Sequence, residues 1–212
     1  EPEFNVAPSK GTNGLAVVGG GYTMGGASDG TYIYISQNMS GNGSTRILKL
    51  NPDTYEVIAT SATFDTGIIG TKDNSRLFIK DGKLYCVVVG RTVRSIELSA
   101  FTDGCEIAVD ESLPIENVAG NLIDMEYNAT AQKYAVLGDG AKLYLLGNDG
   151  SLVKEVPITG KPSEQASQNP SSIASDENYI YVSHKVDDQN DVLIMVYDWE
   201  GNFVGSCAPS GI

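Results

Sequence analysis

The stretch Asp29-Gly30-Thr31-Tyr32-Ile33-Tyr34-Ile35-Ser36 decides the fold of this chain. A turn made by Asp and Gly leads into a run of apolar and aromatic residues that is typical of a short β-strand. Variants of the stretch return as Asp81–Val88 and Asp176–Ser183, and Ala131–Gly138 is a degenerate copy. The four copies begin at residues 29, 81, 131 and 176, so the steps are 52, 50 and 45 residues. A period in this range that is carried by strands indicates a repeat architecture of the propeller kind.

The repeats divide most of the chain into four segments, at about 22–66, 67–116, 117–160 and 161–212. No amphipathic helical pattern is sustained for three turns, so we expect almost no helix. The prediction is an all-β fold, a β-propeller of about four four-stranded blades, with five blades as the alternative. Residues 1–21 do not fill a repeat. Either they supply strands that close the ring, or they are the tail of a preceding domain.

A turn rich in Asn, Asp and Gly joins the third and fourth strands of three repeats. It reads Leu50-Asn51-Pro52-Asp53, Gly147-Asn148-Asp149-Gly150 and Asp198-Trp199-Glu200-Gly201. Together with the apolar strands on either side, this turn resembles the repeats of NHL-like and YVTN-like β-propellers. The chain as a whole looks like an exported propeller module of a bacterial cell-surface protein, such as those of gut Bacteroidetes. The resemblance implies a binding or scaffolding module.

The glycines of residues 19–26 superficially look like a phosphate-binding loop. A dinucleotide-binding loop needs a strand before it and a helix after it, whereas here a strand pattern follows. We therefore expect these glycines to allow close approach of the backbone near the axis of the ring.

Composition limits the possible partners. The net charge is −13, from 27 acidic and 14 basic residues, and such a surface repels nucleic acid. No run of 18 apolar residues occurs, so no membrane span is expected. Abundant Gly, Ser, Thr and Asn with few thiols and little Lys predict an extracellular or cell-surface location. Because the chain starts at Glu1 rather than at Met, we expect it to be part of a longer one.

The three cysteines do not suggest a disulfide framework, because their number is odd and no CxxC occurs. Cys86 is expected to be a small buried apolar residue. Cys105 and Cys207 fall in the predicted last strands of repeats two and four, Cys105–Val109 and Asn202–Cys207.

The predicted binding site lies in the loops between the second and third strands. These loops are short in repeats two and three, but span 37–45 in repeat one and 184–191 in repeat four. If the ring closes, repeats one and four are neighbours and the two long loops meet on one rim. The alternative is two unrelated insertions. The candidate residues in these loops are Asn38, Asn42, His184, Lys185, Asp187, Asp188 and Asp191.

Each of these residues also has an ordinary explanation. The acidic side chains of 187–191 could ligate Ca²⁺, but their spacing matches no known Ca²⁺ loop, so no cofactor is predicted. His184 is the only histidine, and a catalytic role would need a nucleophile or carboxylate beside it. Asn38, Asn42 and Asn128 head Asn-x-Ser/Thr sequons, which also arise by chance in a chain rich in Asn and Ser. Trp199 is expected to be partly exposed, where it either stacks on a sugar ring or covers a blade edge.

The function predicted from the sequence is a non-enzymatic, extracellular binding or scaffolding module whose ligand is a glycan or a surface protein. One alternative is an extracellular glycan-active hydrolase or lyase with acid–base chemistry near His184. The other is a structural or adhesion spacer of a longer surface protein.

Overall fold

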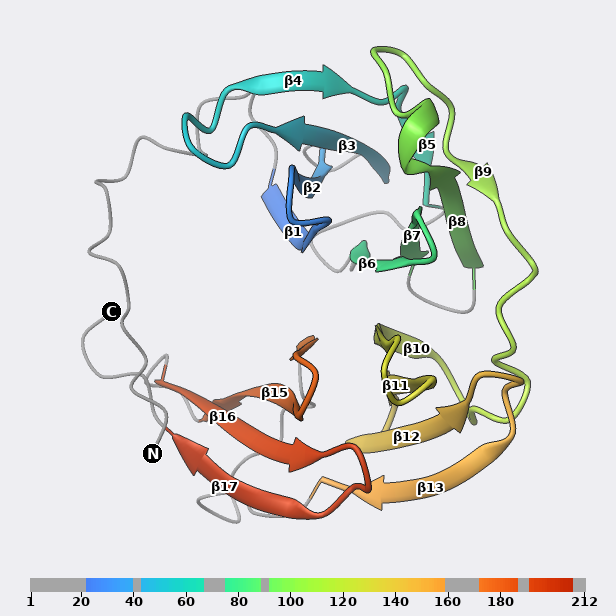
Figure 1. The fold of residues 1–212 in the computed structure, drawn as a ribbon, viewed down its shortest axis with the longest axis vertical. Coiled ribbons are helices and arrows are strands. Elements are labelled where there is room, and N and C mark those ends of the chain that lie inside the picture. Colours follow the sequence, from blue (N-terminus) through green and yellow to red (C-terminus); the bar gives the residue numbers. More distant parts are fainter. Residues whose placement is uncertain are drawn as a thin grey trace.

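The computed structural model describes residues 22–39, 43–66, 75–88, 92–158, 172–186 and 191–207. They form four antiparallel sheets arranged around a common axis, a four-bladed β-propeller (Figure 1). The predicted fold class is therefore confirmed. A single 3₁₀ turn, η1 (Leu98–Ala100), is the helical element of the described residues, and none of their helices is long and apolar enough to span a bilayer. Residues 1–21 lie outside the described part.

The strands follow one another outward from the axis in each blade. Blade 1 contains β1 (Tyr22–Ser28), β2 (Ile33–Asn38), β3 (Ser44–Leu50), β4 (Val57–Thr60) and the short β5 (Phe64–Asp65). Blade 2 contains β6 (Arg76–Lys80), β7 (Lys83–Val88), β8 (Thr92–Glu97) and β9 (Ala108–Val109). Blade 3 contains β10 (Leu122–Asn128), β11 (Lys133–Gly138), β12 (Lys142–Gly147) and β13 (Leu152–Pro157). Blade 4 contains β14 (Ser172–Ser175), β15 (Tyr179–Val186), β16 (Asp191–Asp198) and β17 (Phe203–Cys207).

The first strand of every blade is the innermost one, so the turns after these strands gather at one end of the axis (Figure 1). We call this end the inner-turn rim and define it by residues 29–32, 81–82, 129–132 and 176–178. Because successive strands are antiparallel, the connections between second and third strands lie at the opposite rim.

The core lies between neighbouring blades. On β11, Tyr134 and Val136 pack into the cluster shared with blade 2, whereas Ala135 and Leu137 pack into the cluster shared with blade 4. Both faces of the strand are therefore buried, which explains why apolar residues stand side by side in the repeated stretch instead of alternating with polar ones. Burying one such large side chain stabilises the fold by about 1.5–3 kcal/mol.

The repeated stretch itself is held by one carboxylate. Asp29 Oδ1 accepts hydrogen bonds from the N–H groups of Thr31 (2.8 Å) and Tyr32 (2.7 Å), and Oδ2 accepts one from the Tyr34 hydroxyl (3.0 Å). Burial acts to raise the pKa of the Asp29 carboxyl, but these bonds together hold it below its usual value. The aspartate therefore fixes the turn and the first tyrosines of the strand at once.

Blade 4 repeats this arrangement atom for atom. Asp176 Oδ1 accepts from the N–H groups of Asn178 (2.8 Å) and Tyr179 (2.7 Å), and Oδ2 accepts from the Tyr181 hydroxyl (2.7 Å). The sequence similarity between Asp29–Ser36 and Asp176–Ser183 is thus a shared hydrogen-bond pattern.

Close approach of inner strands depends on Gly25. A Cβ atom at this position would lie 2.7 Å from the carbonyl oxygen of Ser75, next to β6. The expectation that glycines of this stretch allow close backbone approach is confirmed at Gly25.

Blade 2 differs from the prediction at its outer edge. The strand expected at Cys105–Val109 contains only Ala108 and Val109. The preceding residues bond to blade 1 instead: the Ala62 N–H donates to the Cys105 carbonyl and the Gly104 N–H to the Thr60 carbonyl, both at 2.8 Å. All three cysteines are free thiols, and Cys86 is fully buried, as expected.

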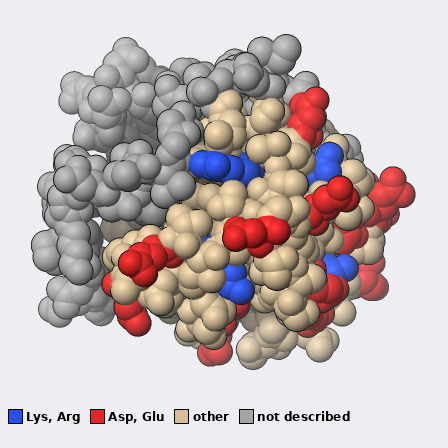
Figure 2. All heavy atoms as spheres, turned by 90° about the horizontal axis from the view of Figure 1, so that it is seen from above, with Lys and Arg blue, Asp and Glu red and all other residues tan. Residues whose placement is uncertain are grey.

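Acidic side chains spread over the described part of the face in Figure 2, with basic side chains between them. This distribution agrees with the excess of 27 acidic over 14 basic residues in the chain.

We predict that Gly201→Ala destabilises the protein by roughly 2 kcal/mol, because residue 201 has a φ of +75° and left-handed backbone costs an L-residue about 1–2 kcal/mol. A Cβ atom there would also lie 2.6 Å from Val156 Cγ2. Gly205→Ala is the matched control, because no atom lies within 4 Å of its added Cβ. Urea unfolding monitored by circular dichroism measures both; equal midpoints for the two variants would contradict the described turn.

Candidate functional site

The inner strands of all four blades end around a hollow of about 470 Å³ at the inner-turn rim. We call it the axial hollow. Its lining consists of Ala27, Ser28, Phe78, Ile79, the residues of 126–130 and those of 174–177. Each blade therefore contributes its first strand or the turn that follows. The volume falls within the size range of small-ligand sites.

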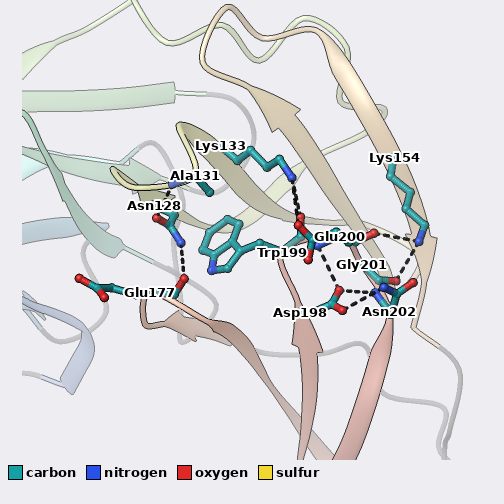
Figure 3. Close-up of polar contacts among 10 residues, drawn as sticks. All are labelled: Asn128, Ala131, Lys133, Lys154, Glu177, Asp198, Trp199, Glu200, Gly201 and Asn202. Atoms are coloured by element: carbon teal, nitrogen blue, oxygen red, sulfur yellow. Dashed lines mark hydrogen bonds and ion pairs between the residues drawn. The ribbon is translucent and has the colours of Figure 1, made fainter.

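Asn128 shapes the hollow between blades 3 and 4. Its Oδ1 accepts a hydrogen bond from the Ala131 N–H (2.9 Å), and its Nδ2 donates to the Glu177 carbonyl (3.0 Å) (Figure 3). Asn128 therefore closes its own turn and ties it to the turn of the next blade. This explains how the degenerate copy at Ala131–Gly138 forms a turn without the Asp-Gly pair of its siblings.

Trp199 lies behind this joint and is only 3% exposed (Figure 3). Its indole N–H donates to the Asp176 carbonyl (3.0 Å), and its ring belongs to the cluster between blades 3 and 4. The expectation of partial exposure is wrong, because the turn between β16 and β17 folds its tryptophan inward. Trp199 covers the edge of its blade and offers no ring face to a sugar.

Lysines near the rim are engaged in joints between blades. Lys133 Nζ donates to the Trp199 carbonyl (3.0 Å), and Lys154 Nζ donates to the carbonyls of Glu200 (2.9 Å) and Gly201 (3.2 Å) (Figure 3). These two side chains of blade 3 hold the β16–β17 turn of blade 4.

Lys80 forms the corresponding joint between blades 2 and 3. Its Nζ lies 4.7 Å from the ring centre of Tyr127 and 4.9 Å from that of Tyr134. The same nitrogen donates hydrogen bonds to the Tyr134 hydroxyl (2.6 Å) and to Asn148 Oδ1 (3.0 Å). Cation–π contacts of this kind contribute about 0.5–2 kcal/mol each.

Asp124 joins β10 to β14 from a position that is 2% exposed. Its Oδ2 accepts hydrogen bonds from the Ile173 N–H (2.8 Å) and the Ser172 hydroxyl (2.9 Å), and its Oδ1 accepts one from the Met125 N–H (2.8 Å). Burial raises the pKa of Asp124 to about 6, although these bonds and the charge of Arg76 act in the opposite sense. The Asp124 carboxylate thus accepts three hydrogen bonds from groups of the protein itself.

Glu126 follows two positions later on β10 and lines the hollow with a partly buried side chain. Burial, and then the charge of Asp124, raise its pKa well above the usual value, while a hydrogen bond from the Ser175 side chain opposes the shift. Perturbed carboxyls in a concave site mark functional positions more often than chance. The signal in the sequence was the pair of acids at 124 and 126 in a strand that is otherwise mostly apolar.

The predicted loops prove shorter than expected, because the strands extend into them. β2 runs to Asn38 and β3 begins at Ser44, with Gln37 opposite Arg46 and Asn38 opposite Thr45. β15 runs to Val186 and β16 begins at Asp191, which pair with each other. The predicted loop limits 37–45 and 184–191 are therefore wrong, because residues 37–38, 44–45, 184–186 and 191 belong to paired strands.

The predicted site residues fall into three groups. Asn38 lies on β2 and is 3% exposed, so its sequon does not present its amide to solvent in the folded protein. The same holds for Asn128, which heads a sequon without being a predicted site residue and is 5% exposed. His184 and Lys185 lie on β15, opposite Leu193 and Val192, and Asp191 starts β16. Asn42, Asp187 and Asp188 lie outside the described residues.

The axial hollow and the predicted site lie at opposite ends of the blades. Residues 174–177 line the hollow before β15 begins, whereas His184 lies toward the far end of that strand. Sequence reasoning missed the hollow because it considered only loops of unequal length. In the described part of the chain, no three His, Cys, Asp or Glu side chains gather as a metal site.

Comparisons with known proteins bear on the fold alone. No protein-family model matches the sequence, and no curated protein is significantly similar to it. The structure of Raptor from Chaetomium thermophilum matches with a TM-score of 0.50 and 13% identity, over 89% of this chain and 17% of that one. A chain of the COPII outer coat vertex on membranes matches with a TM-score of 0.54 and 12% identity, over 90% of this chain and 50% of that one.

A protein of unknown function from Bacteroides caccae matches with a TM-score of 0.47 and 14% identity, over 89% of this chain and 61% of that one. This chain thus spans less than two thirds of each of these structures. The likenesses to Raptor and to the COPII coat chain, with TM-scores of 0.50 and 0.54, show the fold alone and say nothing of partners or activity. The resemblance to NHL-like and YVTN-like repeats stays a prediction.

We predict that Asp124→Asn removes part of the pH dependence of stability. A carboxyl whose pKa rises from 3.8 to about 6 on folding binds its proton more tightly in the folded state. Its contribution to stability is therefore present below about pH 4 and is lost as pH rises through about 6. Relative to the parent, the Asp124→Asn variant should gain about 2 kcal/mol between about pH 4 and about pH 7, measured by urea unfolding.

Glu106→Gln serves as the control for this measurement, because Glu106 is exposed and precedes β9. A difference between the Asp124→Asn variant and the parent that does not change with pH would contradict the assignment of a buried, proton-binding carboxyl at Asp124.

Proposed function

We propose that this propeller is a non-enzymatic binding module that receives part of a partner in the axial hollow. The observation that carries the proposal is the lining of the hollow, to which all four blades contribute. A group that fills it contacts residues from four sheets, and buried clusters join blade 1 to blade 2, blade 2 to blade 3 and blade 3 to blade 4. Rigid elements of this kind hold binding residues with little loss of entropy when a ligand arrives.

A protein partner fits the hollow better than a glycan. Sugar binding commonly uses an exposed aromatic ring face, and the aromatic residues of this region do not offer one. Phe78 is buried, the ring of Tyr127 is covered by Lys80, and Trp199 packs between blades. The exposed aromatic side chains of the described residues, Tyr55, Tyr179 and Phe203, do not line the hollow.

Binding is favoured over catalysis because Asp124 and Asp176, two carboxyls that could act together with Glu126, each accept three hydrogen bonds from groups of the protein. General acid–base chemistry by a carboxyl pair needs both groups to reach the substrate. Asp124 instead accepts three hydrogen bonds inside the joint between β10 and β14, and only Glu126 of the two lines the hollow. The alternative enzyme centred on His184 gains no support from the hollow, since His184 lies toward the other end of β15.

The proposal is tested by nuclear magnetic resonance titration with two classes of probe: the monosaccharides glucose and N-acetylglucosamine, and the N-acetyl methylamides of lysine, leucine and glutamate. We expect an amino-acid probe to shift the backbone amides of Ala27, Thr130 and Ala174. Ala174→Trp places a large ring at the exposed Ala174 in the lining and should weaken this binding at least tenfold.

Ala108→Trp is the matched control, because Ala108 is equally exposed but lies on the outer strand β9. The proposal is overturned if no probe of either class shifts the amides around the hollow. It is also overturned if Ala174→Trp leaves the binding unchanged.

A further inference from the structure

The charged residues that line the axial hollow are all acidic. They are Glu126 from β10 and Asp176 and Glu177 from the turn after β14. Lysine and arginine are missing from the described lining. The Asp176 carboxyl has a lowered pKa, since its bonds to Tyr181 and to two backbone N–H groups outweigh the effect of burial, so it is ionised at neutral pH. The hollow therefore carries net negative charge.

The basic side chains nearest to the rim do not offset this charge inside the hollow. Lys80 is held by Tyr134 and Asn148, and Lys133 by the Trp199 carbonyl. Arg76 of β6 acts on Asp124 and does not line the hollow. These cations interact with groups of the protein outside the hollow. The negative charge of the lining is therefore available to a cationic ligand.

Glu126 keeps capacity for a further partner. A carboxylate has about four acceptor positions on its two oxygens, and the Ser175 side chain supplies one hydrogen bond. Its neighbour Asp124 repels the ionised form, which a cation in the hollow would relieve. A charge-assisted hydrogen bond in such a partly buried place is about twice as strong as a neutral one.

The walls suit the hydrocarbon part of a long side chain. Ala27, Ile79 and Ala174 line the hollow together with Glu126 and present apolar surface. Lysine and arginine side chains combine an aliphatic stem with a terminal cation, and they bury the stem along apolar surface. A metal ion has no hydrocarbon part to pack against these apolar walls, and a sugar has hydroxyl groups around its ring.

We propose that the axial hollow takes the side chain of a lysine or arginine from a protein partner, with Glu126 as its counter-ion. The inference rests on the proposed binding function and names the chemistry of the partner. The stem lies against the apolar walls, and the terminal cation donates its hydrogen bonds to the carboxylate of Glu126.

Binding of the cation is coupled to a proton. The ionised carboxyl of Glu126 attracts the cation and the protonated one does not, so occupation displaces the proton of Glu126. Affinity therefore rises with pH until Glu126 is ionised in the free protein and is constant above that point. The ionisable groups around Glu126 are Asp124 from β10, whose charge acts on it, and Asp176 and Glu177, which line the same hollow from the turn after β14. Arg76 from β6 acts on Asp124, Tyr127 lies on the opposite face of β10, and β1 contributes the non-ionisable Ala27 and Ser28.

The test compares n-butylammonium and n-butylguanidinium with the neutral n-butanol, which has the same stem. Affinities come from shifts of the amides of Ala27, Glu126 and Ala174 in nuclear magnetic resonance titrations. We expect both cations to bind at the hollow at least tenfold more tightly than n-butanol, and their affinity to increase as pH is raised from about 5 to about 8. Glu126→Gln should lower the affinity at least tenfold at the upper pH and leave only the weaker pH dependence that comes from Asp124.

Glu106→Gln is the charge-matched control, because Glu106 is exposed and does not line the hollow. The amide spectrum of Glu126→Gln shows directly whether the variant is folded. If n-butanol binds in the hollow as tightly as the cations, the inference is overturned while the proposed binding function stands. If the folded Glu126→Gln variant binds the two cations as tightly as the parent does, the inference is likewise overturned and the proposed binding function stands. If none of the three probes shifts the amides of the hollow, the inference is overturned, and the titrations with sugars and blocked amino acids decide the proposed function separately.

Discussion

Blades 2 and 3 bury apolar side chains on both of their faces, and this constraint determines how the sheets are arranged. A sheet such as β10–β13 cannot bury Tyr134 and Val136 on one side and Ala135 and Leu137 on the other without a neighbour on each side. Neighbouring blades therefore pack face to face, and their inner strands converge on the axis. The inner strands approach one another closely at Gly25, because β1 passes the backbone of Ser75 at a distance where a Cβ atom would not fit. The axial hollow is what remains where the four inner strands turn away from one another.

Much of this could be read from the sequence, because the fold rests on local patterns. The repeat of Asp29–Ser36 predicted the number of blades, and its aspartate makes bonds within a few residues of itself. The site could not be predicted in the same way. Its lining comes from strands that are distant in sequence, and only packing between blades decides which of them meet. The prediction for Trp199 failed for a similar reason: its neighbours suggest an exposed turn, whereas its indole reaches back to Asp176 in the same blade.

The two acids of β10 divide two tasks between adjacent positions on one face of a strand. Asp124 accepts three hydrogen bonds and links blade 3 to blade 4, so its burial is compensated within the protein. Glu126 has the Ser175 side chain as a hydrogen-bond partner, so the cost of its burial is offset less, and it lines the hollow where a ligand can reach it. Burial of a carboxyl with few partners costs stability, and such a cost is typical of positions that are kept for binding. This division is the physical basis for the proposal that binding takes place at the inner-turn rim.

The most direct measurement is a crystal structure of the protein with n-butylammonium at a pH where Glu126 is ionised. We expect the butyl chain along the apolar wall of the axial hollow, with the nitrogen about 2.7–3.2 Å from a carboxylate oxygen of Glu126. A ligand bound only at the opposite rim, or one in the hollow whose nitrogen points away from Glu126, would contradict it.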